Sequence, residues 1–247
     1  VALDEDRARK AAAASTERWA KGEALSALDG VPVPVKDEFH MQGLPTRGGT
    51  SWRNQPVDED AFIVTRMRVA GAVLPGKAHA TENGLNPLGY NAHFDYPRNV
   101  YSRKHGAAGS STGSAVSVGL GLAPVAISTD GGGSIRIPAA INGQFGLKPT
   151  LQRLSGTGDI WTGSVGHTGP IGIGSLELVD LLEVTAAHDP LDPMTGFCQD
   201  WGSVVPTWRK ALGRGVKGAR IGVLSTAMDK AEAPIVSAIQ GAVKALE

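Results

Sequence analysis

The sequence lacks several features that would place it in one of the large special classes of protein. Its 247 residues include one cysteine, Cys198, so no disulfide can form within the chain, and a reducing compartment such as the cytoplasm is expected. No apolar run is long enough to cross a bilayer, so no membrane segment is predicted. The charged residues 4–7 come too early for a signal peptide.

An excess of charge of one sign is also missing. Lys and Arg total 24, as do Asp and Glu, so the net charge is zero. A basic patch for nucleic acid or for an anionic membrane is therefore not expected. The histidines at 79, 93 and 105 lack a recognisable metal-ligand spacing, and neither a metal nor an organic cofactor is predicted.

Glycine, by contrast, is abundant, at 33 residues, and it gathers with serine in the segment 106–150. Two loops of small residues, 109–113 and 130–134, flank an apolar segment that reads as a helix followed by a strand. Flexible linkers do not interleave Gly and Ser with Ile, Val, Leu and Pro in this way. Backbone N–H groups and hydroxyls that approach a ligand closely are the better interpretation.

The rest of the chain alternates helix and strand patterns, which predicts an α/β fold with a mixed sheet and helices on both sides. The strand at 30–37 contains alternating prolines, which favours a position at the sheet edge. We expect helices at 4–22, 58–70, 114–122, 134–141, 175–184 and 231–246, and further strands at 71–77, 124–128 and 220–224.

Three kinds of chemistry compete for the two loops. Phosphate binding lacks the spacing of either nucleotide-binding glycine motif. A nucleophile elbow matches Gly109 to Gly113 with Ser111 at its centre, but the polar residues 101–105 precede it where an apolar strand is required. In the third interpretation, Ser134 is a nucleophile whose proton passes through Ser110 to a desolvated Lys36. The plain alternative, that both loops are tight turns, stays open on composition alone.

Three segments together resemble the amidase signature family of serine hydrolases. The family's G-x-P-x-x-V-K-D is matched by residues 30–37, its G-S-S-x-G-S by 109–114 and its T-D-x-G-G-S-I-R-x-P by 129–138. The tail G-x-x-G-L-K-P-T is matched by residues 143–150. The similarity covers roughly residues 25–193, with a signature core at 30–150. Ala108 departs from the pattern, because the family usually has glycine there.

The resemblance implies an amidase that works through a serine acyl-enzyme. It implies Ser134 as nucleophile, Ser110 as bridging serine after a cis peptide bond, and Lys36 as base. The implied oxyanion donors are the N–H groups of Gly131, Gly132 and Gly133. Asp130, Arg136 and Ser111 are expected to support these loops.

The resemblance also implies a small-molecule amide substrate and an amidase fold that continues past residue 247. The chain is thus expected to be one α/β domain over 1–247, incomplete at its C-terminal end: either a fragment or a fold that a second chain or a homo-oligomer completes. Two alternatives remain: the amidase subunit of a tRNA-dependent amidotransferase, and a catalytically silent fragment that serves as an interaction module.

Overall fold

The computed structural model describes residues 1–160, 164–197 and 208–246. These residues divide into two compact units, Val1–Arg209 and Lys210–Glu247. Cys198 lies outside the described residues. The expectation of one domain over 1–247 stays a prediction.

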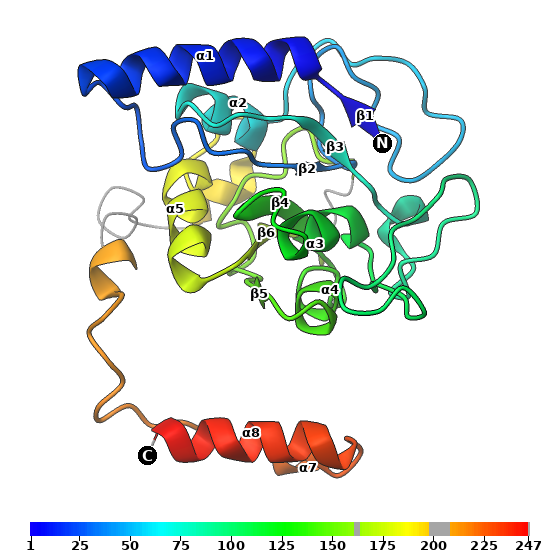
Figure 1. The fold of residues 1–247 in the computed structure, drawn as a ribbon, viewed down its shortest axis with the longest axis vertical. Coiled ribbons are helices and arrows are strands. Elements are labelled where there is room, and N and C mark those ends of the chain that lie inside the picture. Colours follow the sequence, from blue (N-terminus) through cyan, green and yellow to red (C-terminus); the bar gives the residue numbers. More distant parts are fainter. Residues whose placement is uncertain (161–163, 198–207, 247) are drawn as a thin grey trace. The chain divides into compact units, whose positions relative to one another are not determined.

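Six strands of the described residues form one mixed sheet in the first unit, in the order β1-β3-β2-β4-β6-β5 (Figure 1). The pairs β2–β3 and β2–β4 are parallel, and the other pairs are antiparallel. The strands are β1 (Ala2–Leu3), β2 (Val35–Lys36), β3 (Gly76–Ala78), β4 (Val125–Asp130), β5 (Phe145–Gly146) and β6 (His167–Gly172).

The helices of this unit cover both faces of the sheet, which confirms the predicted fold class. The α-helices are α1 (Glu5–Lys21), α2 (Phe62–Val69), α3 (Thr112–Gly119), α4 (Arg136–Ile141) and α5 (Ser175–Thr185), and the 3-10 helices are η1 (Glu82–Gly84) and η2 (Pro193–Phe197). The first helix ends as its sequence predicts, because Gly22 adopts a left-handed φ of 73° and its N–H caps the carbonyl groups of the last turn.

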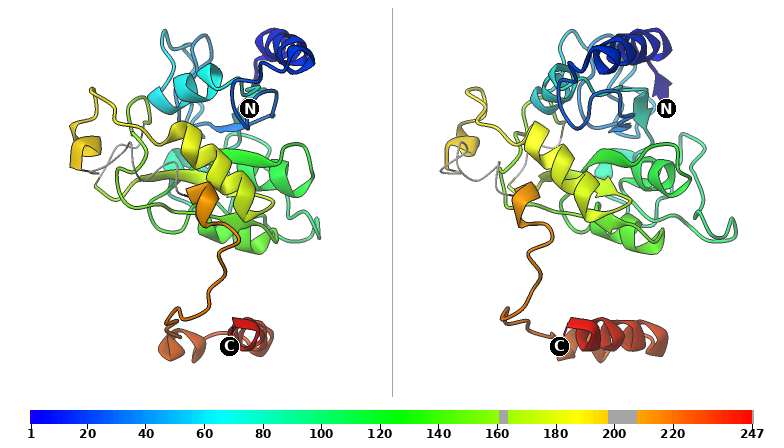
Figure 2. Two further views of the ribbon diagram at one scale, coloured as in Figure 1. Left: turned by 90° about the vertical axis from the view of Figure 1, so that its left-hand side faces the viewer. Right: turned by 60° about the vertical axis from the view of Figure 1, so that its left-hand side comes forward.

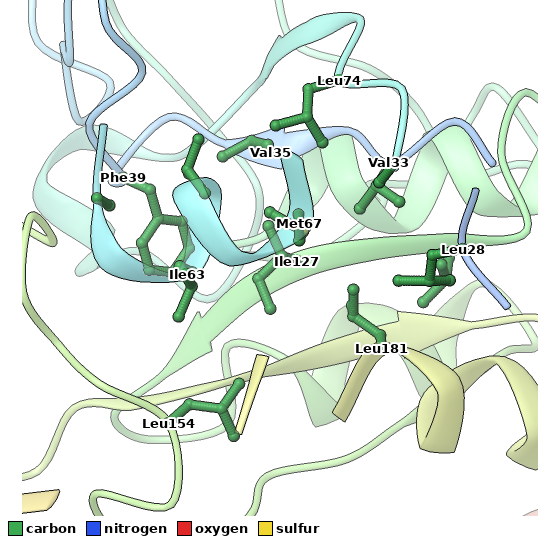
Figure 3. Close-up of a cluster of buried hydrophobic side chains, with 14 of the residues drawn as sticks. Leu28, Val33, Val35, Phe39, Ile63, Met67, Leu74, Ile127, Leu154 and Leu181 are labelled. Atoms are coloured by element: carbon green, nitrogen blue, oxygen red, sulfur yellow. The ribbon is translucent and has the colours of Figure 1, made fainter. Parts of the chain in front are cut away.

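Alternation along β4 divides the core into two layers. Val125 and Ile127 pack with α2 and α5 in the larger buried cluster (Figure 3). Ala126, which points to the opposite face, packs with α3 and α4. Figure 2 shows α5 and α3 on opposite sides of the sheet. Each fully buried aliphatic side chain of these layers stabilises the fold by about 1.5–3 kcal/mol, so β4 is held firmly from both sides.

Two sequence-based expectations about strands are wrong. The proline-containing strand is central, because β2 pairs with both β3 and β4. Its prolines do not interrupt the pairing, since Val33 donates to the Val73 carbonyl while the Pro34 carbonyl accepts from Ile127. Residues 220–224, in the second unit, form no strand and are exposed. An apolar alternation makes a strand only where a partner edge is present.

The second unit contains two described helices, α7 (Ser225–Met228) and α8 (Ala233–Leu246). The latter lies within the predicted range 231–246. Its apolar residues recur at helical spacing, but none of its side chains is buried.

Candidate functional site

Parallel pairing of β2 with β4 brings the predicted lysine to the glycine–serine segment. Val35 is in register with Ile127, so the carboxyl ends of the two strands meet at the same edge of the sheet. Lys36 ends β2 and is fully buried. Its Nζ donates to Ser110 Oγ at 2.7 Å and to Thr129 Oγ1 at 2.7 Å. The contact between Lys36 and Ser110 is the one that the proposed proton relay requires.

Ser110 lies in the loop that precedes α3 and is 1% exposed. The peptide bond between Gly109 and Ser110 is cis, as the resemblance implies. Ala108, the residue that departs from the family pattern, has a φ of 58°. This left-handed conformation explains why glycine is usual at that position.

Ser110 and Ser134 both line a cavity of about 460 Å³ at the carboxyl ends of β2 and β4. The cavity has one polar wall, which contains the two serines, Thr129 and the glycines at 131 and 132. Its other walls are mainly apolar. The apolar side chains that line it are Leu85, Pro87, Ile137 and Val165.

A network around Asp130 holds the loop that carries Ser134. The Asp130 carboxylate is fully buried and accepts two bonds from the Arg136 guanidinium, at 2.9 Å each. It also accepts from the N–H groups of Gly133 (2.8 Å) and Ile135 (3.2 Å). Burial alone would raise the pKa of Asp130, but these hydrogen bonds outweigh it and lower the pKa to about 2.

This network affects the expected oxyanion donors. Since the N–H of Gly133 donates to Asp130, it does not point freely into the cavity. The N–H groups of Gly131 and Gly132 make no hydrogen bond to any described residue. Both of these glycines line the cavity and are exposed. Of the three expected donors, these two are therefore the ones whose N–H groups have no partner among the described residues.

Ser111, the serine at the centre of the motif that resembles a nucleophile elbow, is held by hydrogen bonds to the second loop and its strand. Ser111 is fully buried, and its hydroxyl donates to the Thr129 carbonyl at 3.3 Å. Its N–H donates to the Ser134 carbonyl at 3.3 Å. Ser111 thus joins the two loops, in agreement with a supporting role.

Sequence reasoning missed Glu38, which follows Lys36 by two residues and is 1% exposed. Its Oε2 lies 3.1 Å from Lys36 Nζ and accepts a bond from Thr129 Oγ1 at 2.5 Å. A sign of its importance was present in the sequence, because a third charged residue directly follows the Lys-Asp pair at the end of an apolar strand.

Asp37, between these two residues, belongs to a separate buried ion pair. Its Oδ1 lies 3.3 Å from Lys77 Nζ, and Lys77 also donates to the carbonyl of Phe39. Burial raises the pKa of Asp37 and lowers the pKa of Lys77, while each partner counteracts the shift of the other. This pair fixes β3 to the turn after β2 and does not line the cavity.

Neither a metal site nor a membrane span is found within the residues that the structure describes. No group of three or more His, Cys, Asp or Glu side chains among them is arranged to hold a metal ion. None of the described helices combines the length and the hydropathy that a bilayer crossing requires.

The fold and the site together define a class: an α/β protein with two serines at one cavity and a buried lysine bonded to one of them, the side chains used in serine–lysine acyl transfer. Comparison with known proteins agrees. The family model described as Amidase matches residues 1–247, and the chain belongs to the amidase family.

Relatives within this family differ in what they act on. The chain is 41% identical to fatty acid amide hydrolase of Arabidopsis thaliana over 174 residues, which are 69% of this chain and 29% of that protein. It is 39% identical over 227 residues to the A subunit of glutamyl-tRNA(Gln) amidotransferase of Anaeromyxobacter sp. (strain K), covering 90% of this chain and 45% of that protein.

Among solved structures, native peptide amidase from Stenotrophomonas maltophilia superimposes with a TM-score of 0.76 at 35% identity, over 83% of this chain and 42% of that one. The chain therefore has the amidase fold, and it spans less than half the length of each of these relatives.

Proposed function

We propose that the protein containing this chain hydrolyses a carboxylic amide to an acid and ammonia or an amine through a serine acyl-enzyme. Ser134 is the nucleophile, Ser110 the relay and Lys36 the base. The observation that carries the proposal is the 2.7 Å contact between Lys36 Nζ and Ser110 Oγ, made beside a cavity that both serines line.

The reaction uses the site as follows. Ser134 attacks the amide carbonyl while its proton passes to Ser110 and the proton of Ser110 passes to Lys36. The N–H groups of residues 131 and 132 stabilise the negative charge that develops on the carbonyl oxygen. The proton then returns through the same two groups to the leaving amine, and water hydrolyses the acyl-enzyme by the same steps.

The cavity favours an amide with an uncharged, apolar acyl group. Glu38 is the single charged residue among the described side chains that line it, and it is turned toward Lys36. Apart from the polar wall, the remaining lining is mainly apolar, with Asn83 and Ser164 as its polar side chains, so a charged acyl group would lose its hydration without gaining a partner of opposite charge. Similarity to fatty acid amide hydrolase and to peptide amidase supports an organic amide substrate.

A second candidate is the amidase subunit of a tRNA-dependent amidotransferase, because similarity to the A subunit of glutamyl-tRNA(Gln) amidotransferase extends over 90% of the chain. In that case, partner subunits would assemble with this protein. Another relative, the AtzE subunit of 1-carboxybiuret hydrolase, is also part of a larger enzyme by its name, which supports a partner chain in either case. A cytoplasmic location is consistent with the lone cysteine.

A fluorophosphonate probe tests the nucleophile in the full-length protein. The probe should label the wild type, and Ser134→Ala should abolish labelling and lower amide hydrolysis by roughly a thousandfold or more. Lys36→Ala should also remove activity while the protein remains folded by circular dichroism. Ser111→Ala is the matched control and should still be labelled. Labelling that persists in Ser134→Ala, or disappears in Ser111→Ala alone, would refute the assignment.

Ammonia release from a panel of amides distinguishes the candidates. A hydrolase should release ammonia or amine from simple amides without added tRNA or ATP. An amidotransferase component should instead require its partner subunits, with glutamine as the amide donor. A folded protein that neither reacts with the probe nor releases ammonia under either condition would be the silent interaction module.

A further inference from the structure

The carboxylate of Glu38 is the nearest charged group to Lys36. Glu38 Oε2 lies 3.1 Å from Lys36 Nζ, and the two side chains are 1% and 0% exposed. Thr129 joins them a second time, because its Oγ1 accepts from Lys36 at 2.7 Å and donates to Glu38 at 2.5 Å. The other carboxylate oxygen of Glu38, Oε1, is buried and has no hydrogen-bond partner among the described residues.

The surroundings of Lys36 Nζ suit an ammonium group. An ammonium has three N–H donors, and three acceptors lie around Nζ: the hydroxyls of Ser110 and Thr129 and the carboxylate of Glu38. The proposed reaction, however, requires a neutral amine, because only a free lone pair can take the proton of Ser110. A proton must therefore leave Lys36 before Ser134 attacks.

We propose that Glu38 is a positioning residue that sets the protonation state of Lys36, by holding the ammonium form at rest and accepting its proton when the base is needed. This inference rests on the proposed function. In the first step, one N–H bond of Lys36 breaks and an O–H bond forms on Glu38 Oε2. The lone pair freed on Nζ then takes the proton of Ser110, and Ser110 takes the proton of Ser134 as the new C–O bond forms.

The proton count balances over the cycle. The proton taken from Ser134 returns through Lys36 and Ser110 to the nitrogen of the leaving group when the C–N bond breaks. The proton held on Glu38 goes back to Lys36 after the acyl-enzyme is hydrolysed. No group outside the site supplies or removes a proton in acylation, which suits a base that is fully buried.

The other charged groups near Lys36 and Glu38 each have a partner of opposite charge. The Asp37–Lys77 ion pair lies on the far side of the turn, where the Arg47 N–H donates to Asp37, and Glu38 adds to the negative potential at Lys77. On the side of β4, Asp130 is neutralised by Arg136. The carboxylate that contacts Lys36 directly is thus the main electrostatic influence on its charge.

Glu38→Gln tests the inference, because it keeps the shape of the side chain and removes the charge. We would measure the rate of fluorophosphonate labelling at about pH 6 and about pH 9 and take the ratio of the two rates. Without the carboxylate, the Lys36 ammonium loses its charged partner at 3.1 Å, so a larger share of the labelling should remain at pH 6. The pH 6 to pH 9 ratio should rise by about tenfold or more over the wild type.

Two further variants keep the test decisive. Glu38→Asp withdraws the carboxylate by one methylene group, so the ratio should rise in the same direction by a smaller factor; this variant carries the test if Glu38→Gln does not fold. Glu59→Gln removes an exposed carboxylate that does not line the cavity and should leave the ratio unchanged. Circular dichroism checks that each variant is folded.

The outcomes separate the two proposals. Ratios for both Glu38 variants within about twofold of the wild type, in proteins that remain labelled at Ser134, would overturn the role of Glu38 and leave the proposed function intact. A wild-type protein that is not labelled would overturn the proposed function and this inference with it.

Discussion

Replacement of Asp130 by asparagine should destabilise the protein much more than removal of its partner Arg136. The carboxylate is fully buried, whereas the Arg136 side chain is 52% exposed. Oδ1 accepts from Gly133 and Arg136, and Oδ2 accepts from Ile135 and again from Arg136. Asparagine can replace one of these oxygens as an acceptor but not both.

The magnitudes follow from which donors lose their acceptor. In Asp130→Asn, the buried N–H of Ile135 would face an amide NH2 group, which costs about 1–3 kcal/mol. The charge-assisted bond from Arg136 Nε is lost as well. We therefore expect the free energy of unfolding to fall by about 2–4 kcal/mol in total. In Arg136→Ala the buried carboxylate keeps its backbone donors, and water can replace the half-exposed guanidinium as a donor, so this ion pair contributes little. The expected loss is about 1 kcal/mol.

Urea unfolding of both variants measures the difference, with equal m-values as the check that the compactness of the end states is unchanged. The wild type should also lose stability as the pH falls from about 4 toward 2, because the folded carboxylate has a pKa of about 2 and the unfolded one about 3.8. Asp130→Asn should show a shallower fall, because Asp29 and Asp189, whose pKa values are also lowered in the folded protein, still contribute. A larger loss in Arg136→Ala than in Asp130→Asn would refute the reasoning.

Two further predictions concern the segment where α3 packs on β3. Gly113→Ala would place a Cβ 2.2 Å from the backbone nitrogen of His79, so the free energy of unfolding should fall by about 1–3 kcal/mol. Gly241→Ala is the control: its Cβ would meet no atom within 4 Å, and it should not lower the free energy of unfolding in the same urea assay. Burial lowers the pKa of His79 from 6.5 to about 4. The protein should therefore lose stability as the pH drops through this interval, where the unfolded state takes up a proton and the folded state does not. His79→Gln should flatten that part of the curve of unfolding free energy against pH, and an unchanged curve would contradict this prediction.

The glycine-rich loops and the lysine could be predicted from the sequence because each depends on local residue types. Small residues permit close approach of the two loops, and three motifs in family order point to one site. The contact between Lys36 and Ser110 agrees with that expectation, since residues 74 apart meet at 2.7 Å. The roles assigned to Ser134, Ser110 and Lys36 stay predictions.

The features that were missed depend on tertiary pairing. The strand β6 was not among the expected strands, since glycine and proline are disfavoured inside strands, and it forms by pairing with β4 along its whole length. The central place of β2 could not be read from its prolines, because the partner strands determine which N–H groups are needed. Glu38 stands out in the sequence only as a third charged residue after the Lys-Asp pair, and its contacts with Lys36 and Thr129 depend on folding.

The meeting of β2 with β4 also has a consequence for the order of folding. Lys36 is separated from Ser110 by 74 residues and from Thr129 by 93, so neither contact can form until long stretches of chain have been closed into loops. Local segments such as α3 and α5 need no such closure. Helical structure can therefore accumulate during refolding well before the lysine reaches its hydroxyl partners, and the site comes into being only when the centre of the sheet is complete.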